Sequence, residues 1–248
     1  MICIEIFIRF RQTRRLFQRF WKFISFQSYL NLQTKIIIEL CWPNNKIIPD
    51  LSFVKADDET VKFALDLKTS YRLPNNPEFC NGFTLGSHGM YFINRKSNKN
   101  IQFPYDEYLG HFCLGIIYSR SAAGKIDETR TYKLDELKSI VSVVGNFDFF
   151  VHEKWEIASD SQGSFNTANI GSICKISDLL EGNGVFKNLG EQWFDDYWMN
   201  YGKIKMTTPN GEVKTITMLK NFLVYRGQDP QLANPALRKP SRKNIRQV

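Results

Sequence analysis

The chain has 248 residues, of which 43% are hydrophobic and 23% are charged. This composition is typical of a globular protein and excludes disorder over most of the length. The net charge of +8 comes from the two ends: residues 1–30 hold six basic residues and one acid, and residues 228–248 hold five and one. The 197 residues between them hold 22 basic and 23 acidic side chains. Cationic ends suit an anionic polymer or a membrane surface as partner.

Several protein classes are disfavoured. The five cysteines are scattered without a CxxC pair, which argues against a disulfide framework and a structural zinc site. The three histidines lack ligand spacing, so we expect them at the surface or in the core. No apolar run reaches the roughly 18–20 residues that span a bilayer. Charged residues interrupt the apolar N-terminus, so it lacks the apolar region of a secretory signal. Its Arg-rich, acid-poor character is that of an organellar presequence, but an amphipathic surface helix is favoured, and the cytoplasm is the expected location.

The first half of the chain is predicted to be rich in strands. Residues 1–30 fit one or two basic helices. Alternating side chains predict two strands, Pro49–Lys55 and Val61–Thr69, joined by a polar turn. Phe63, Leu65 and Leu67 then fall on one face of the second strand, and Ala64, Asp66 and Lys68 on the other. Further extended segments are expected at Phe83–Leu85 and Met90–Asn94.

The second half mixes helices and strands. Pro104–Ser119 is predicted to be a helix, because proline and acids in the first turn are typical of a helix start. The elements expected after it are a short helix at Leu134–Ile140, a β-rich stretch at Asn146–Ala158, a polar loop at Ser159–Asn169, a helix at Glu191–Tyr201 and a hairpin at Thr207–Leu219 around Asn210-Gly211. A disordered tail is expected from Gln228. The alternation predicts an α/β or α+β domain with a mixed sheet.

One spacing carries chemistry: Pro49-Asp50, fifteen residues, then Asp66-Leu67-Lys68. Two strands joined by a short turn bring Asp50 and Asp66 together, and Lys68 shares a face with Asp66 at roughly 6–7 Å. Paired carboxylates suit Mg²⁺. A lysine beside the metal can hold an attacking water or stabilise a pentacovalent phosphate, as in metal-assisted phosphodiester hydrolysis. On this PD…DxK motif alone, a nuclease site and a solvated strand edge with a salt bridge both stay open.

Longer stretches resemble a known family. The sequences ALDLKTSY at 64–71 and KWEIASDSQGSFNTANIGSI at 154–173 are similar to the EcoRV family of type II restriction endonucleases, within the PD-(D/E)xK superfamily. The similarity runs from about Trp42 to Tyr201 and resumes at Tyr225-Arg226-Gly227. The resemblance implies a restriction-endonuclease-like mixed β-sheet flanked by helices. It places a catalytic and DNA-binding domain at 42–227, between an atypical basic segment at 1–41 and a basic tail at 228–248.

The resemblance also implies roles for individual residues. Asp50 and Asp66 would bind Mg²⁺, and Lys68 would assist the attacking water. The loop similar to the family's base-reading loop contains Gly163, Ser164, Asn166, Thr167 and Asn169. An Asn amide can bond adenine and a Thr methyl can contact thymine, although such a loop in isolation is an ordinary surface turn. The minor-groove loop would contain Asn44, Asn45 and Lys46. Phosphate contacts would come from Thr69, Ser70, Lys99 and Arg226, each of which could equally be solvated surface.

Three features depart from the family pattern. Phe165 stands where the family loop has glycine, so the loop is expected to clash, tilt or read another site. The minor-groove loop differs in its side chains. The N-terminal segment is atypical, and the supporting acid of the family falls on either Glu5 or Glu39.

The resemblance implies a homodimeric, Mg²⁺-dependent deoxyribonuclease that cuts double-stranded DNA at GATATC to leave blunt ends, with a cognate DNA methyltransferase in the host. Two-fold symmetry in the protein would match the palindrome. One alternative is a DNA-binding relic that has lost cleavage, which the altered N-terminus favours. A second alternative is an interaction protein with a basic tail, which the loop similarity disfavours.

Overall fold

The computed structural model describes residues 38–41, 48–55, 57–120, 131, 133–139, 142–163, 168–207 and 210–235. Within these residues the main feature is a mixed sheet with strand order β1-β2-β3-β6-β7, in which β4 also pairs with β3. Strands β3 and β6 run parallel, and the other neighbours are antiparallel. The strands are β1 (Ile38–Cys41), β2 (Leu51–Lys55), β3 (Asp58–Leu73), β4 (Asn76–Cys80), β6 (Gly110–Arg120) and β7 (Val144–Glu153). The predicted mixed sheet of an α/β protein is confirmed.

The hairpin of β2 and β3 forms where the sequence predicts two strands. Leu51 lies opposite Leu65, and Phe53 lies opposite Phe63. The alternation has the predicted consequence: Leu65 joins a small apolar cluster on one face of the sheet. Ala64, on the other face of β3, belongs to the main core. Strand β3 continues past its predicted end to Leu73, because β6 and β4 pair with that part of it.

The predicted helix at Pro104–Ser119 is wrong. One 3₁₀ turn, η1 (Tyr105–Glu107), leads into strand β6 instead. Pro104, Asp106 and Glu107, which suggest a helix start, belong to this single turn. Strand β6 lies between β3 and β7, and Cys113, Leu114 and Ile117 are at most 1% exposed. A strand that is buried on both faces is apolar without interruption, so its sequence lacks the two-residue alternation by which strands are recognised.

Other expectations also need correction. The segment Met90–Asn94 is not extended: α2 (Met90–Ile93) forms there, because the Gly89 carbonyl accepts hydrogen bonds from two N–H groups of the next turn. Within the polar loop expected at Ser159–Asn169, residues 159–162 and residue 169 are strand, and residues 164–167 lie outside the described residues. Two short strands, β8 (Ala158–Gln162) and β9 (Asn169–Ser172), form a second sheet with β5 (Thr84–Ser87), in the order β5-β9-β8. Polar residues suit β8, because its side chains become exposed toward its end.

Strand β7 is followed by a helical turn rather than by more strand. The turn is α3 (Lys154–Ile157), which a reciprocal capping box between Glu153 and Glu156 begins. The side chain of Glu153 accepts from the helix backbone, and that of Glu156 accepts from the Glu153 N–H. This pairing ends the β-rich stretch that the sequence predicts as far as Ala158.

The remaining elements follow the prediction more closely. Helix α5 (Glu191–Asn200) is confirmed, and so is the hairpin of β10 (Lys205–Thr207) and β11 (Val213–Thr215). The short helix at Leu134–Ile140 is present as a 3₁₀ helix, η2 (Leu134–Ser139). Two further helices are α4 (Ile176–Leu180) and α6 (Leu219–Tyr225).

The beginning of the expected disordered tail has structure. Residues 228–235 include η3 (Pro230–Leu232) and the buried Ala233, and the Asn234 N–H donates to the Val185 carbonyl. The rest of the tail, 236–248, and the helices expected at 1–30 lie outside the described residues.

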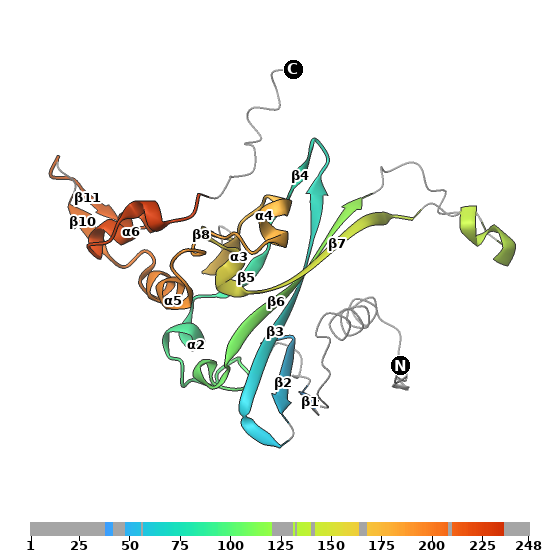
Figure 1. Ribbon diagram of the computed structural model, residues 1–248, viewed down its shortest axis with the longest axis horizontal. Helices are drawn as coiled ribbons and strands as arrows, with labels where there is room; N and C mark the ends of the chain where they lie inside the picture. Colours follow the sequence, from blue (N-terminus) through green and yellow to red (C-terminus); the bar gives the residue numbers. More distant parts are fainter. Residues whose placement is uncertain are drawn as a thin grey trace.

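The main core lies on one side of the long strands. Figure 1 shows α3, α4, α5 and α6 gathered on that side, with β5 and β8 among them. Aromatic rings fill this core, and the largest fully buried side chains include Phe186, Phe194, Tyr197 and Trp198. None of the described helices is long and apolar enough to cross a membrane.

Packing between β6 and β7 generates a stability prediction. Gly115 lies opposite Phe150, and a Cβ atom at Gly115 would be 2.0 Å from the Phe150 ring. Gly115→Ala should therefore lower the free energy of unfolding by about 1–3 kcal/mol, measured by urea denaturation, because the ring must move. The control is Gly145→Ala in β7, where an added Cβ has nothing within 4 Å and the change should stay within about 0.5 kcal/mol. Equal effects of the two substitutions would contradict this packing.

Candidate active site

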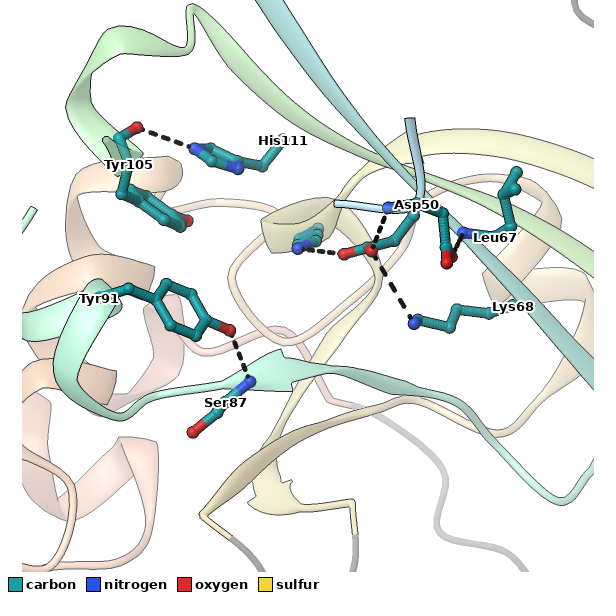
Figure 2. Close-up of polar contacts among 9 residues, drawn as sticks. Asp50, Leu67, Lys68, Ser87, Tyr91, Tyr105 and His111 are labelled. Atoms are coloured by element: carbon teal, nitrogen blue, oxygen red, sulfur yellow. Dashed lines mark hydrogen bonds and ion pairs between the residues drawn. The ribbon is translucent and has the colours of Figure 1, made fainter. Parts of the chain in front are cut away.

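Asp50 lies directly before β2, where a second segment holds the backbone. The N–H of Ile48 donates to the Asn100 carbonyl, and the Ile48 carbonyl accepts from the Gln102 N–H. The Asp50 carboxylate crosses to the neighbouring strand, where its Oδ2 accepts a hydrogen bond of 2.8 Å from the Leu67 N–H. Figure 2 shows this contact beside the Lys68 side chain. Residues 100–102 thus hold the backbone just before Asp50, and β3 holds the Asp50 carboxylate.

Asp66 and Lys68 come from β3 itself. The register that sets Leu51 opposite Leu65 brings Asp50 next to Asp66. The Asp50 N–H donates to Asp66 Oδ1 at 3.4 Å, and the Lys68 ammonium lies 3.9 Å from the same oxygen. Asp66 is 3% exposed, whereas 29% of the Lys68 side chain is exposed. The structure therefore brings the three motif residues together as the spacing predicts.

A second lysine, which the sequence reasoning missed, is the nearer cation to Asp66. The Lys154 Nζ lies 2.6 Å from Asp66 Oδ2, and 9% of its side chain is exposed. Lys154 is the first residue of α3. Its sequence neighbourhood, EKWE, is that of an ordinary polar turn, and no spacing rule connects it with the motif. The ion pair of Lys154 with Asp66 is visible only in the folded chain.

The two buried charges stabilise each other. Burial by itself would raise the pKa of Asp66, but the Lys154 and Lys68 ammonium groups hold that pKa well below its ordinary value. Burial would lower the pKa of Lys154, but the Asp66 carboxylate raises it above the ordinary value. Both groups are therefore ionised at neutral pH.

The expected phosphate contacts are scattered. Thr69 and Lys99 are exposed. Ser70 is 4% exposed, which does not suit a direct contact with DNA. Arg226 is half-exposed, and its guanidinium pairs with the Asp196 carboxylate at 2.7 Å.

The structure describes only the two ends of the predicted reading loop. The Gly163 N–H donates to the Asn169 carbonyl at 2.9 Å, and the His88 N–H donates to the Ala168 carbonyl at 2.9 Å. These bonds fix the base of the loop on the β5-β9-β8 sheet. Several expected site residues lie outside the described residues: Glu5, Asn44, Asn45, Lys46, Ser164, Phe165, Asn166 and Thr167. The other expected supporting acid, Glu39, lies in β1 opposite Val54.

The donor chemistry near Asp66 is that of two carboxylates. Among the described residues, no group of three or more His, Cys, Asp or Glu side chains is placed to hold a metal. His111 lies near the site but is a core residue, 6% exposed. Its ring stacks on Tyr105 at 3.7 Å between centroids and bonds the Tyr105 carbonyl. His111 is thus a hydrogen-bonded core residue, one of the two placements that the sequence predicts for the histidines.

Comparisons with known proteins give the relationship of the chain. Residues 12–227 match the family model described as restriction endonuclease EcoRV. The chain is 36% identical over 181 residues to the type II restriction enzyme EcoRV of Escherichia coli, and the match covers 73% of this chain and 70% of that enzyme. The matched region includes the hairpin with Asp50 and Asp66 and extends past Arg226.

His111 makes acid stability testable. Burial, and then the nearby Lys154 charge, lower the pKa of His111 from 6.5 to about 3. Between these values the unfolded chain binds the proton that the folded chain excludes, so His111 makes stability fall as pH falls through this window. The slope should approach about 1.4 kcal/mol per pH unit. In His111→Gln this contribution should disappear from urea denaturation measured between pH 7 and 4.5.

The test compares how steeply the free energy of unfolding changes with pH in the wild type and in His111→Gln. A lower stability of the variant at every pH does not alter this slope. Burial also lowers the pKa of His88, so part of the pH dependence should remain in His111→Gln. The same slope in the variant and the wild type would contradict the neutral, buried state of His111.

Proposed function

We propose that this chain, which belongs to the EcoRV family of type II restriction endonucleases, hydrolyses double-stranded DNA at GATATC with Mg²⁺ and leaves blunt ends. The observation that carries the proposal is the convergence of Asp50, Asp66 and Lys68 at one end of the β2–β3 hairpin. We further propose a homodimer acting in the cytoplasm of a host that holds a matching DNA methyltransferase. The catalytic and DNA-binding domain would be 42–227, with a basic segment before it and a basic tail after it.

The residues present fit a hard divalent cation. Mg²⁺ is usually held by one or two carboxylates and completes its shell with waters and phosphate oxygens. Asp50 and Asp66 would supply the carboxylates, and the low pKa of Asp66 keeps that ligand ionised despite its burial. When bound, the cation would polarise the phosphate and favour deprotonation of a water.

Lys68 is suited to contact the reacting groups. Its ammonium lies 3.9 Å from Asp66 Oδ1, beyond hydrogen-bond distance, so its N–H groups are not used on that oxygen. The partial exposure of the side chain leaves it accessible from solvent. Lys68 would orient the attacking water and stabilise the negative charge that develops on the phosphate.

Sequence reading would fall to the loop between β8 and β9. An Asn amide can bond N6 and N7 of adenine together, and a Thr methyl can contact the thymine methyl. Asn166 and Thr167 would make these contacts, with Gly163, Ser164 and Asn169 supporting the loop against DNA. The minor groove would be approached by Asn44, Asn45 and Lys46, and phosphates by Thr69 and Lys99. A two-fold dimer would present two such loops to the two halves of a palindrome.

Digestion of DNA of known sequence tests the proposal. Wild-type protein with Mg²⁺ should give blunt fragments that end at the centre of GATATC, and EDTA should abolish them. Asp50→Ala or Asp66→Ala should also abolish cleavage, because one remaining carboxylate holds the ion poorly. Lys68→Ala should lose turnover while it keeps its fold, measured by circular dichroism, and most of its DNA affinity in Ca²⁺.

Asp57→Ala is the matched control, because Asp57 lies in the same hairpin but its side chain is 77% exposed and pairs with Lys55. It should cleave at the wild-type rate. Near wild-type cleavage by Asp50→Ala or Asp66→Ala would refute the site, and unfolding of Lys68→Ala would make that lysine structural. DNA binding by the wild type without any cleavage would identify a relic of the family.

The reading loop gives a separate prediction. A two-point contact with adenine is worth about 1–3 kcal/mol, so Asn166→Ala should slow cleavage at the cognate site by roughly one to two orders of magnitude. Phe165→Gly should raise cleavage of GATATC if the ring displaces the loop. If the loop is refitted to another site, the same substitution should damage cleavage there.

Arg242→Ala in the tail is the control for this measurement. It should weaken binding to all sequences alike and flatten the salt dependence, because it removes a phosphate attraction and not a base contact. If neither Asn166→Ala nor Phe165→Gly changes cleavage, the loop does not read DNA in this protein.

A further inference from the structure

Lys154 is a buried cation that the PD…DxK motif does not contain. The residue is 8% exposed, and lysine is almost never buried unless it is paired. Its partner is Asp66, whose Oδ2 lies 2.6 Å from the Lys154 Nζ. The side chain reaches Asp66 from the turn between β7 and α3, on a different part of the chain from the motif hairpin.

The two oxygens of Asp66 have different partners. Oδ2 contacts Lys154, while Oδ1 faces the Asp50 N–H and, at longer distance, Lys68. Lys154 therefore holds the carboxylate in one orientation and turns Oδ1 toward the motif residues. This makes Lys154 a determinant of the geometry of Asp66.

Strand β5 leaves room for the Lys154 ammonium. A Cβ atom at Gly86 would lie 3.6 Å from Lys154 Nζ and 3.2 Å from the Tyr91 hydroxyl. The φ angle of Gly86 is +113°, a conformation that side-chain-bearing residues rarely adopt. The backbone of β5 thus passes close to the Lys154 ammonium, and a glycine at position 86 leaves space for it.

The charges of this group balance without a metal. Asp50 and Asp66 contribute two negative charges, and Lys68 and Lys154 contribute two positive ones. Removing one partner of a buried ion pair leaves an uncompensated charge, which is strongly destabilising. A divalent cation at Asp66 would supply positive charge to the same carboxylate, so the need for Lys154 would be smaller when the cation is present.

We propose that Lys154 is a positioning residue that acts as the internal counter-ion of Asp66 until a divalent cation takes over that charge. The inference rests on the proposed metal site at Asp50 and Asp66. It differs from a merely structural ion pair in one measurable respect: the contribution of Lys154 to stability depends on the metal.

The test is thermal unfolding of wild type and Lys154→Met in EDTA and in saturating Mg²⁺, without DNA. In EDTA the variant should melt lower by on the order of 10 °C, because the buried Asp66 loses its nearer cation and keeps only Lys68 at 3.9 Å. In Mg²⁺ this gap should narrow, since a ligand that binds the folded state stabilises it and here also neutralises Asp66. The readout does not depend on cleavage.

Two controls isolate the effect. Arg95→Met breaks another largely buried ion pair, between Arg95 and Asp195 at 2.7 Å, and its melting gap should be the same in EDTA and in Mg²⁺. The double variant Asp66→Asn with Lys154→Met removes both charges, so it should melt well above Lys154→Met in EDTA and should lose the larger response to Mg²⁺.

The outcomes separate this inference from the proposed function. If Mg²⁺ raises the melting temperature of wild type and leaves the Lys154→Met gap unchanged, Lys154 is only a structural partner and the inference is overturned alone. If Mg²⁺ raises neither melting temperature, the metal site itself is overturned and the inference with it. If Lys154→Met does not fold in EDTA, folding on addition of Mg²⁺ supports the inference, and failure to fold in both solutions overturns it.

Discussion

The carboxylate of Asp66 must stay ionised in a place that water hardly reaches, and the rest of the site is arranged around that requirement. An isolated buried charge would lose its hydration without compensation. Lys154 at 2.6 Å and Lys68 at 3.9 Å supply positive charge from two directions, and the Asp50 N–H adds a dipole. Because these groups come from β3, from the residue before β2 and from the turn after β7, the ion pair depends on the central sheet being correctly assembled.

The parallel pairing of β3 with β6 brings the end of β7 close to Asp66. Strand β6 lies beside β3 from Phe63 to Tyr71, and its other edge carries β7. Strand β7 therefore ends at a fixed distance from Asp66, and the capping box of Glu153 and Glu156 turns the chain at that point. Gly115 lies opposite Phe150, and the absence of a side chain at Gly115 leaves space for the Phe150 ring. Gly115 is also the register partner of Lys68 in β3, so this packing lies in the strands directly beside the motif residues.

The sequence predicted the parts of the site that are local and missed the part that is not. Asp50, Asp66 and Lys68 belong to one hairpin, so alternation and a short turn suffice to bring them together. Lys154 is placed beside Asp66 by β6 and β7. The proline and acids before β6 predict a helix there, and a strand buried on both faces has no alternating pattern that would indicate a strand instead. The short strands β8 and β9 were missed for the opposite reason, since their polar residues read as loop. Pairing with β5 and with each other, and not intrinsic preference, makes them strands.

Strand β5 connects the predicted reading loop with the carboxylates. Ser87 lies opposite Asn169, and the next residue, His88, donates its N–H to the Ala168 carbonyl at the end of the loop. The Ser87 N–H donates to the Tyr91 hydroxyl, and at Gly86 the same strand passes beside the Lys154 ammonium. Three successive residues, Gly86, Ser87 and His88, thus contact the base of the loop and the surroundings of Asp66. A shift of β5 along β9 would move both, so the spacing between the base of the loop and the surroundings of Asp66 depends on the pairing of a single short strand.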